Sequence, residues 1–156
     1  MKRVFALSGK ANSGKSTTVR KLFELLRPES SECNILRQTS KEIRAILRIE
    51  EVLVGIESKG DVSDHVEASL KDFAQKRCHV IVCACRTKRG NVVTAVECLR
   101  PEYDIEWLFK GQVKDPMQQE SASIKKAHEL AGKVRAAVKA ICAIHKSEAS
   151  PTLIKG

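Results

Sequence analysis

The sequence reads Val4-Phe5-Ala6-Leu7 and then Gly9-Lys10-Ala11-Asn12-Ser13-Gly14-Lys15-Ser16, a segment of the form G-x-x-x-x-G-K-S. The apolar run is typical of a buried β-strand, and a helix is predicted to begin near Lys15. Apolar residues then recur at the spacing of one helical face, namely Val19, Leu22, Phe23 and Leu26. The segment therefore joins a strand to a helix that packs one face on a sheet.

This strand, loop and helix pattern predicts a binding loop for a nucleoside triphosphate with Mg²⁺. Its glycines let successive backbone N–H groups point inward at the positive end of the helix. We expect Lys15 to reach the β- and γ-phosphates and to act in catalysis, and we expect Ser16 to bind the metal. The candidate nucleotide contacts are Gly9, Lys10, Ala11, Asn12, Ser13, Gly14, Lys15, Ser16, Thr17 and Thr18. The alternative interpretation of the segment is a fortuitous glycine-rich turn.

The stretch from Val4 to Arg27 resembles the first βα unit of P-loop NTPases, a superfamily that includes small kinases, GTPases and motor ATPases. The order of the later elements resembles compact P-loop kinase-like proteins. The sequence of the stretch Gly55–Asp61 resembles that of a group of small P-loop ATPases. The resemblance implies the P-loop NTPase fold and nucleotide binding, but it implies no specific activity.

Length and composition favour one intracellular domain. With 156 residues, of which 42% are hydrophobic, we expect a domain over 1–146 and a flexible tail over 147–156. No apolar run approaches the ~20 residues of a membrane span, and no signal-peptide region follows Met1. We therefore expect a cytoplasmic protein without membrane contact. The six cysteines include no C-x-x-C pair, and most of them are expected to be core thiols. Cys83 and Cys85 are expected on one face of a strand, where normal packing is favoured over a metal or redox role.

Strands and helices alternate along the chain, which predicts an α/β fold. We expect a single doubly wound, mainly parallel five-stranded sheet with helices on both faces. The strands after the first are expected at 33–36, 52–56, 80–84 and 103–109. The last of these alternates in polarity, which suits an edge strand half covered by the long C-terminal helix. That helix is predicted to start at Asp115-Pro116, at Ser121 or at Ser123.

The region between 39 and 56 allows two interpretations. Thr39-Ser40-Lys41-Glu42 resembles a capping box, which predicts a short helix through Leu47. Either that helix is followed by one strand, or residues 46–56 form a hairpin that turns at Glu50-Glu51.

An acidic cluster, Glu57-Ser58-Lys59-Gly60-Asp61, follows a strand that we expect beside the Val4–Leu7 strand. P-loop proteins usually carry at this place the acid that holds Mg²⁺ through water. Asp61 is the first choice for this role and Glu57 the second, and Asp61 is also a candidate catalytic residue. Alternatively the loop binds the γ-phosphate through the Gly60 N–H, or Asp61 only caps the next helix.

A basic cluster, Arg86-Thr87-Lys88-Arg89, follows the clearest central strand. Arg86 is a candidate catalytic residue that stabilises charge on the transferred phosphoryl group, and the alternative is a solvated basic turn. Arg37-Gln38-Thr39 is a weaker candidate for the acceptor or switch region. Asp64 and His65 are weak candidates for a catalytic base.

The net charge of +9, from 28 Lys and Arg against 19 Asp and Glu, suggests an anionic partner. Nucleic acid is considered but not favoured, because the basic residues are dispersed and aromatic residues make up only 4% of the chain. ATP is favoured over GTP, since no Asn-Lys-x-Asp sequence occurs.

We therefore expect an Mg-ATP-binding enzyme that cleaves the β–γ phosphate bond, either a small kinase with an unknown small acceptor or an ATP hydrolase. The alternatives are an NTPase switch coupled to a protein or nucleic-acid partner, and a nucleotide-binding protein with negligible turnover.

Overall fold

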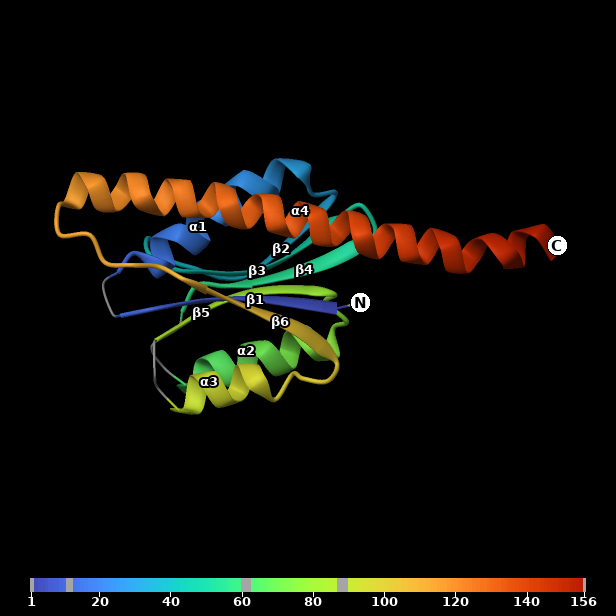
Figure 1. The fold of residues 1–156 in the computed structure, drawn as a ribbon, viewed down its shortest axis with the longest axis horizontal. Coiled ribbons are helices and arrows are strands. Elements are labelled where there is room, and N and C mark those ends of the chain that lie inside the picture. The colour runs from blue at the N-terminus through green and yellow to red at the C-terminus, as the bar shows by residue number, and fades with distance from the viewer. Residues whose placement is uncertain (1, 11–12, 60–62, 87–89, 156) are drawn as a thin grey trace.

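The chain forms one mixed β-sheet between two layers of helices (Figure 1). In this computed structural model, residues 2–10, 13–59, 63–86 and 90–155 are described, with side chains except at 63–66, 86, 90–92 and 148–155. The strands of this part of the chain are β1 (Lys2–Gly9), β2 (Glu32–Gln38), β3 (Ile43–Ile49), β4 (Val52–Glu57), β5 (Val80–Arg86) and β6 (Tyr103–Phe109). The helices are α1 (Lys15–Leu26), α2 (Ser63–Gln75), α3 (Gly90–Glu97) and α4 (Pro116–Lys155), and a 3₁₀ turn covers Arg27–Glu29.

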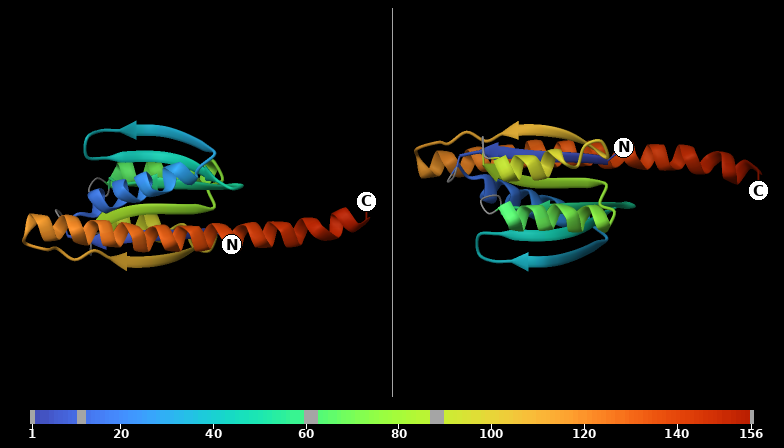
Figure 2. Two further views of the ribbon diagram at one scale, coloured as in Figure 1. Left: turned by 90° about the horizontal axis from the view of Figure 1, so that it is seen from above. Right: turned by 90° about the horizontal axis from the view of Figure 1, so that it is seen from below.

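The strand order is β2-β3-β4-β5-β1-β6, so β2 and β6 form the two edges (Figure 2). The four strands from β4 to β6 in this order run parallel, whereas β2, β3 and β4 pair antiparallel. Residues 80–85 of β5 are apolar and all fully buried, as is typical of a parallel strand that is covered on both faces. The sheet therefore has its parallel part where the helices cover it from both sides.

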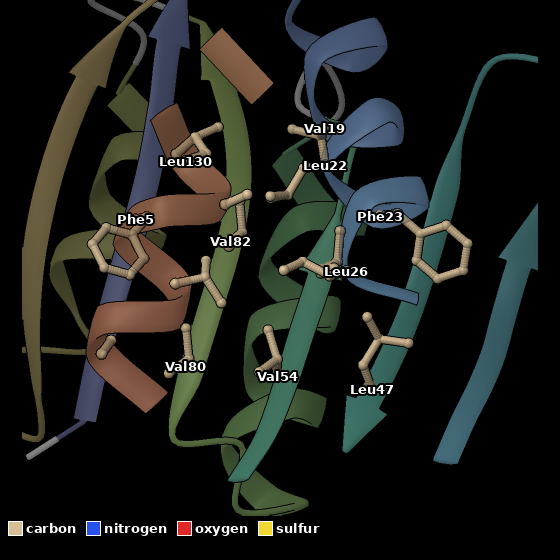
Figure 3. Close-up of a cluster of buried hydrophobic side chains, with 14 of the residues drawn as sticks. Phe5, Val19, Leu22, Phe23, Leu26, Leu47, Val54, Val80, Val82 and Leu130 are labelled. Atoms are coloured by element: carbon tan, nitrogen blue, oxygen red, sulfur yellow. The ribbon is translucent and has the colours of Figure 1, made fainter. Parts of the chain in front are cut away.

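Two hydrophobic clusters hold the layers together. The first joins one face of the sheet to α1 and α4 through residues such as Phe5, Leu22 and Leu130 (Figure 3). The second joins the other face to α2 and α3 through Phe73 and Val96. In α1, Val19, Leu22, Phe23 and Leu26 are all buried, as their helical spacing predicted. The α/β class and the presence of helices on both faces are confirmed.

The expected number of five strands is wrong, because residues 43–49 form the additional strand β3 instead of a helix. Strand β3 is antiparallel to both of its neighbours, so the sheet is mixed, with four adjacent parallel strands. The Thr39 hydroxyl does accept hydrogen bonds from the N–H groups of Lys41 and Glu42, but the turn that it closes leads into a strand. Alternate residues of β3 are buried on the α1 face, namely Ile43, Ala45, Leu47 and Ile49. This period of two matches a strand. The hairpin alternative is confirmed, and Glu50 adopts a φ of 55° at its turn.

The expectation that the 52–56 strand lies beside the Val4–Leu7 strand is also wrong. Strand β5 lies between β4 and β1. Adjacent strands are about 4.8 Å apart, so the end of β4 lies roughly 10 Å across the sheet from the end of β1. This distance matters for the candidate acids that follow β4.

Strand β6 is an edge strand, as predicted, but its aromatic face does not contact α4. Tyr103, Ile105 and Trp107 pack in the cluster of α2 and α3, and the Trp107 indole N–H donates to Glu97 at the end of α3 at 2.9 Å. Helix α4 covers the opposite face of the sheet, where Leu108 contributes to the first cluster.

Helix α4 begins at Pro116, the first of the three predicted starts, and the Met117 N–H donates to the Asp115 carboxylate at 2.9 Å. It continues through Lys155 and projects past the sheet (Figure 1). The predicted flexibility of 147–156 falls largely on residues whose side chains are outside the description, and it stays a prediction. Among the described helices, none is both long and apolar enough to cross a bilayer.

Candidate functional site

The topology of the sheet marks one position for a ligand. Gly9 and Arg86 are paired in parallel register at the carboxyl ends of the neighbouring strands β1 and β5. The helix after β1 lies on one face of the sheet, and the helix after β5 lies on the other face. Ligands of open α/β sheets bind where connections diverge in this way. The Gly9–Ser16 segment therefore begins at the favoured end and place of the sheet.

Both glycines of this segment are required by their surroundings. Gly14 has a φ of 88°, a left-handed conformation that side chains other than glycine rarely adopt. A Cβ on Gly9 would lie 2.5 Å from the carbonyl oxygen of Lys110 and 2.8 Å from the Ser13 hydroxyl. Ala11 and Asn12, two of the predicted contacts, lie outside the described residues.

Lys15 is buried, and its side chain turns back toward Gly9 and Lys10 at the start of the Gly9–Ser16 segment. Its side chain is only 6% exposed, and its Nζ donates hydrogen bonds to the carbonyl oxygens of Gly9 at 2.6 Å and Lys10 at 2.9 Å. The ammonium charge is thus fixed beside the start of the segment instead of extending into solvent.

The positive end of the α1 helix dipole is offset neither by a side-chain cap nor by an acidic residue of the first turn. Gly14, which precedes the helix, makes no side-chain cap, and no acidic residue occurs in the first turn. The N–H groups of a first helical turn have no partner within the helix and attract anions. The Ser13 hydroxyl is buried next to this turn without a hydrogen-bond partner in the described part of the chain.

The two predicted threonine contacts differ in their surroundings. Thr18 is fully buried, and its hydroxyl donates to the Gly14 carbonyl oxygen at 2.7 Å. Thr17 is exposed on the surface of α1. Thr18 thus supports the shape of the segment, whereas Thr17 is accessible from solvent.

Ser16 connects α1 to the chain that follows β4. Its hydroxyl donates to the carbonyl oxygen of Ser58 at 3.2 Å, which leaves oxygen lone pairs available to a cation. Ser58 is itself fixed to β3, because its hydroxyl accepts a hydrogen bond from the Ile43 N–H at 2.8 Å. The Ser16 oxygen is the hard donor that Mg²⁺ prefers, and phosphate and water oxygens would complete the shell.

Glu57, the second choice for a metal ligand, is fully buried with other partners. Arg37 Nη2 lies 3.0 and 3.1 Å from its two carboxylate oxygens, and the Ser69 hydroxyl donates to it at 2.8 Å. Asp61, the first choice, lies outside the described residues. Among the described residues, no group of three His, Cys, Asp or Glu side chains is arranged to hold a metal.

The sequence did not predict that Lys110 and Ser123, from the C-terminal part of the chain, would contact the Gly9–Ser16 segment. The Lys110 ammonium, on a residue only 4% exposed, donates to the Ser13 carbonyl oxygen at 2.7 Å and to Gln119 Oε1 at 3.2 Å. Ser123 of α4 lies close to Gly14, 3.5 Å from its carbonyl oxygen. Burial lowers the pKa of Lys110, and nearby Lys126 lowers it further. The available signal was that Lys110 directly follows β6, which neighbours β1.

The remaining predicted residues divide into two groups. Arg86 ends β5 beside Gly9, but its side chain and residues 87–89 are outside the description, as are the side chains of Asp64 and His65. Cys83 and Cys85 are both buried on one face, as expected, and burial raises the pKa of Cys85 to about 11. They are packed as core thiols.

Comparisons with protein-family models, curated proteins and solved structures gave no match. The interpretation of the site depends on its geometry alone.

Proposed function

We propose that the chain binds MgATP through the Gly9–Ser16 segment and transfers its γ-phosphoryl group to an acceptor or to water. The observation that carries this proposal is the buried Lys15 ammonium, held at 2.6 Å from the Gly9 carbonyl oxygen at the uncapped start of α1. A buried cation and a row of helical N–H donors together suit the phosphates of a nucleotide.

Each residue has a distinct role in the proposed chemistry. Lys15 neutralises charge on the β- and γ-phosphates, and the Gly14 conformation directs the backbone into the first turn of α1. Ser13 contributes a buried hydroxyl that has no hydrogen-bond partner among the described residues. Mg²⁺, when bound by Ser16 and the phosphates, would offset the charge that develops as the β–γ bond breaks.

The positively charged surface supports a nucleic-acid partner less well. Several basic residues on the side of α4 are paired with acids, including Lys133 with Glu106 at 2.6 Å and Arg135 with Glu29 at 2.7 Å. These pairs divide the surface charge among several elements. A small-molecule reaction therefore remains the proposed function.

The test follows the fate of the labelled γ-phosphate of ATP in the presence of Mg²⁺ and a panel of small acceptors. Label on an acceptor identifies a phosphotransferase, and free phosphate alone identifies a hydrolase. Lys15→Ala protein purified in parallel is the blank for contaminating activities. A wild-type rate no higher than this blank would contradict the proposed turnover.

A further inference from the structure

A groove with a cavity volume of about 560 Å³ lies between α1 and the hairpin of β2 and β3. One wall is a single stripe of Arg20, Phe23 and Glu24 of α1 with Arg27, the first residue of the 3₁₀ turn that follows. The opposite wall includes Gln38 and Ile43. We call this cavity the α1 groove. Its volume lies within the range of about 300–1,000 Å³ that is usual for small-molecule sites.

The floor of the α1 groove is apolar. Phe23 is 4% exposed and Ile43 is 1% exposed. Phe23 projects from α1 over β3 on the side of β2 (Figure 3). A ligand in the groove would therefore meet only the small exposed part of these apolar side chains below and polar groups at the rim.

The rim carries more positive than negative charge. Arg20 donates to the Ser40 carbonyl oxygen and lies 3.9 Å from Glu24. The Arg27 guanidinium lies 5.8 Å from the Phe23 ring centroid and has no acidic partner among the described residues. The groove is thus lined by two guanidinium groups and one carboxylate, and this net positive charge favours an anionic ligand.

The α1 groove adjoins the candidate phosphate site. Ile43 donates its N–H to the Ser58 hydroxyl at 2.8 Å, and Ser16 donates to the Ser58 carbonyl oxygen at 3.2 Å. Arg20 follows Ser16 by one turn of α1, about 6 Å along the helix. A ligand at the end of the groove that is lined by Arg20 and Ile43 could therefore extend a hydroxyl group to a phosphate bound at Ser16.

We propose that the α1 groove binds the phosphoryl acceptor, a small organic anion whose phosphate or carboxylate group is held by Arg20 and Arg27. This inference rests on the proposed function. In the transfer, an acceptor hydroxyl oxygen forms a bond to the γ-phosphorus, and the bond from that phosphorus to the β–γ bridging oxygen breaks. Its electron pair leaves with ADP, and the hydroxyl proton passes to solvent.

The binding test uses ¹⁵N-labelled protein without ATP and three probes of similar shape: phenyl phosphate, benzoate and neutral benzyl alcohol. We expect one or both anions to shift the amide signals of Gln38 and Ile43 in a saturable way, and the neutral probe to leave them unchanged. The stronger anion identifies the phosphate or the carboxylate as the preferred group. Equal shifts from all three probes would overturn the proposal, as would dissociation constants above about 10 mM.

Variants locate the anion. Arg27→Gln should weaken anion binding about tenfold or more, because one charge-assisted contact is lost. The matched change Arg48→Gln, at an arginine of β3 that pairs with Glu32 outside the groove, should have no effect. An unchanged affinity in Arg27→Gln would place the anion elsewhere and overturn the proposal.

Lys15→Ala separates this inference from the proposed function. Anion binding that persists in this variant while ATP binding is lost supports both. ATP binding by wild-type protein that binds neither anion overturns the groove proposal alone. Where transfer is measurable, Arg27→Gln should raise the acceptor concentration at half-maximal rate and leave ATP affinity unchanged.

Discussion

The Lys110 ammonium donates a hydrogen bond of 2.7 Å to the carbonyl oxygen of Ser13, a residue 97 positions earlier in the chain. The same ammonium donates to Gln119 near the start of α4, so one buried charge joins β6, α4 and the Gly9–Ser16 segment. The conformation of this segment therefore depends on a part of the chain that no local motif includes.

Replacing Lys110 tests this dependence. Lys110→Met keeps most of the side-chain volume but removes the side-chain donor to the Ser13 carbonyl oxygen and one of the donors to Gln119 Oε1, which also accepts from the Val113 N–H. We therefore expect a loss of about 1–3 kcal/mol in the free energy of unfolding. ATP affinity should fall as well, since the segment loses its support. Urea unfolding and ATP titration measure the two effects, with exposed Lys125→Met as the control. Wild-type values for both would show that Lys110 does not support the segment.

Gly9→Ala should be strongly disruptive. The added Cβ would lie 2.5 Å from a backbone oxygen, that of Lys110, which cannot rotate away as a side chain can. We expect a loss of stability of about 1–3 kcal/mol and weaker ATP binding. Gly132→Ala is the matched control, because a Cβ there meets nothing within 4 Å and should stabilise α4 by about 0.5–1 kcal/mol. Similar melting curves for the two variants would contradict the geometry at Gly9.

Local patterns in the sequence predicted the elements around the segment. The spacing of Val19, Leu22 and Leu26 predicted the buried face of α1, and the Asp115-Pro116 pair predicted one of the possible starts of α4. Such patterns lie within a single element, and the physical reason for each is visible in the sequence.

Pairing between distant strands was not predictable in the same way. A capping-box pattern at Thr39–Glu42 was compatible with a helix over the residues that follow. Those residues form a strand, because Ile43, Ala45 and Leu47 are buried in the core between the sheet and α1. The sequence likewise carries no signal that β5 separates β4 from β1. The partners of Glu57 and the role of Lys110 follow from this order, and so they appeared only with the structure.

Ser16→Ala tests the proposed metal contact. If the hydroxyl acts through Mg²⁺, its loss should weaken ATP binding more in the presence of Mg²⁺ than in EDTA. Ser121→Ala, an exposed position of α4, is the control. Equal losses in the two buffers would exclude the metal contact and leave only the hydrogen bond to Ser58.

The stability of the fold should fall in mild acid because of His79. Burial lowers the pKa of His79, and the neighbouring His145 and Lys2 lower it further. The unfolded chain therefore binds a proton more readily than the folded chain below about pH 6.5, so stability falls with pH from there down to the lowered folded pKa. His79→Gln should flatten this dependence in urea titrations between pH 7 and 5, where His128→Gln, at an exposed position, should not. An unchanged slope in His79→Gln would contradict this role.

The central claim is that Lys15 holds the phosphates of a bound nucleotide, and isothermal titration of MgATP into wild-type and Lys15→Ala protein tests it most directly. We expect wild-type protein to bind and Lys15→Ala to bind about a hundredfold more weakly or not at all, because more than one charge-assisted contact is lost. Lys21→Ala, six residues farther along α1, should bind as wild type does. Wild-type affinity in a folded Lys15→Ala protein would contradict the claim.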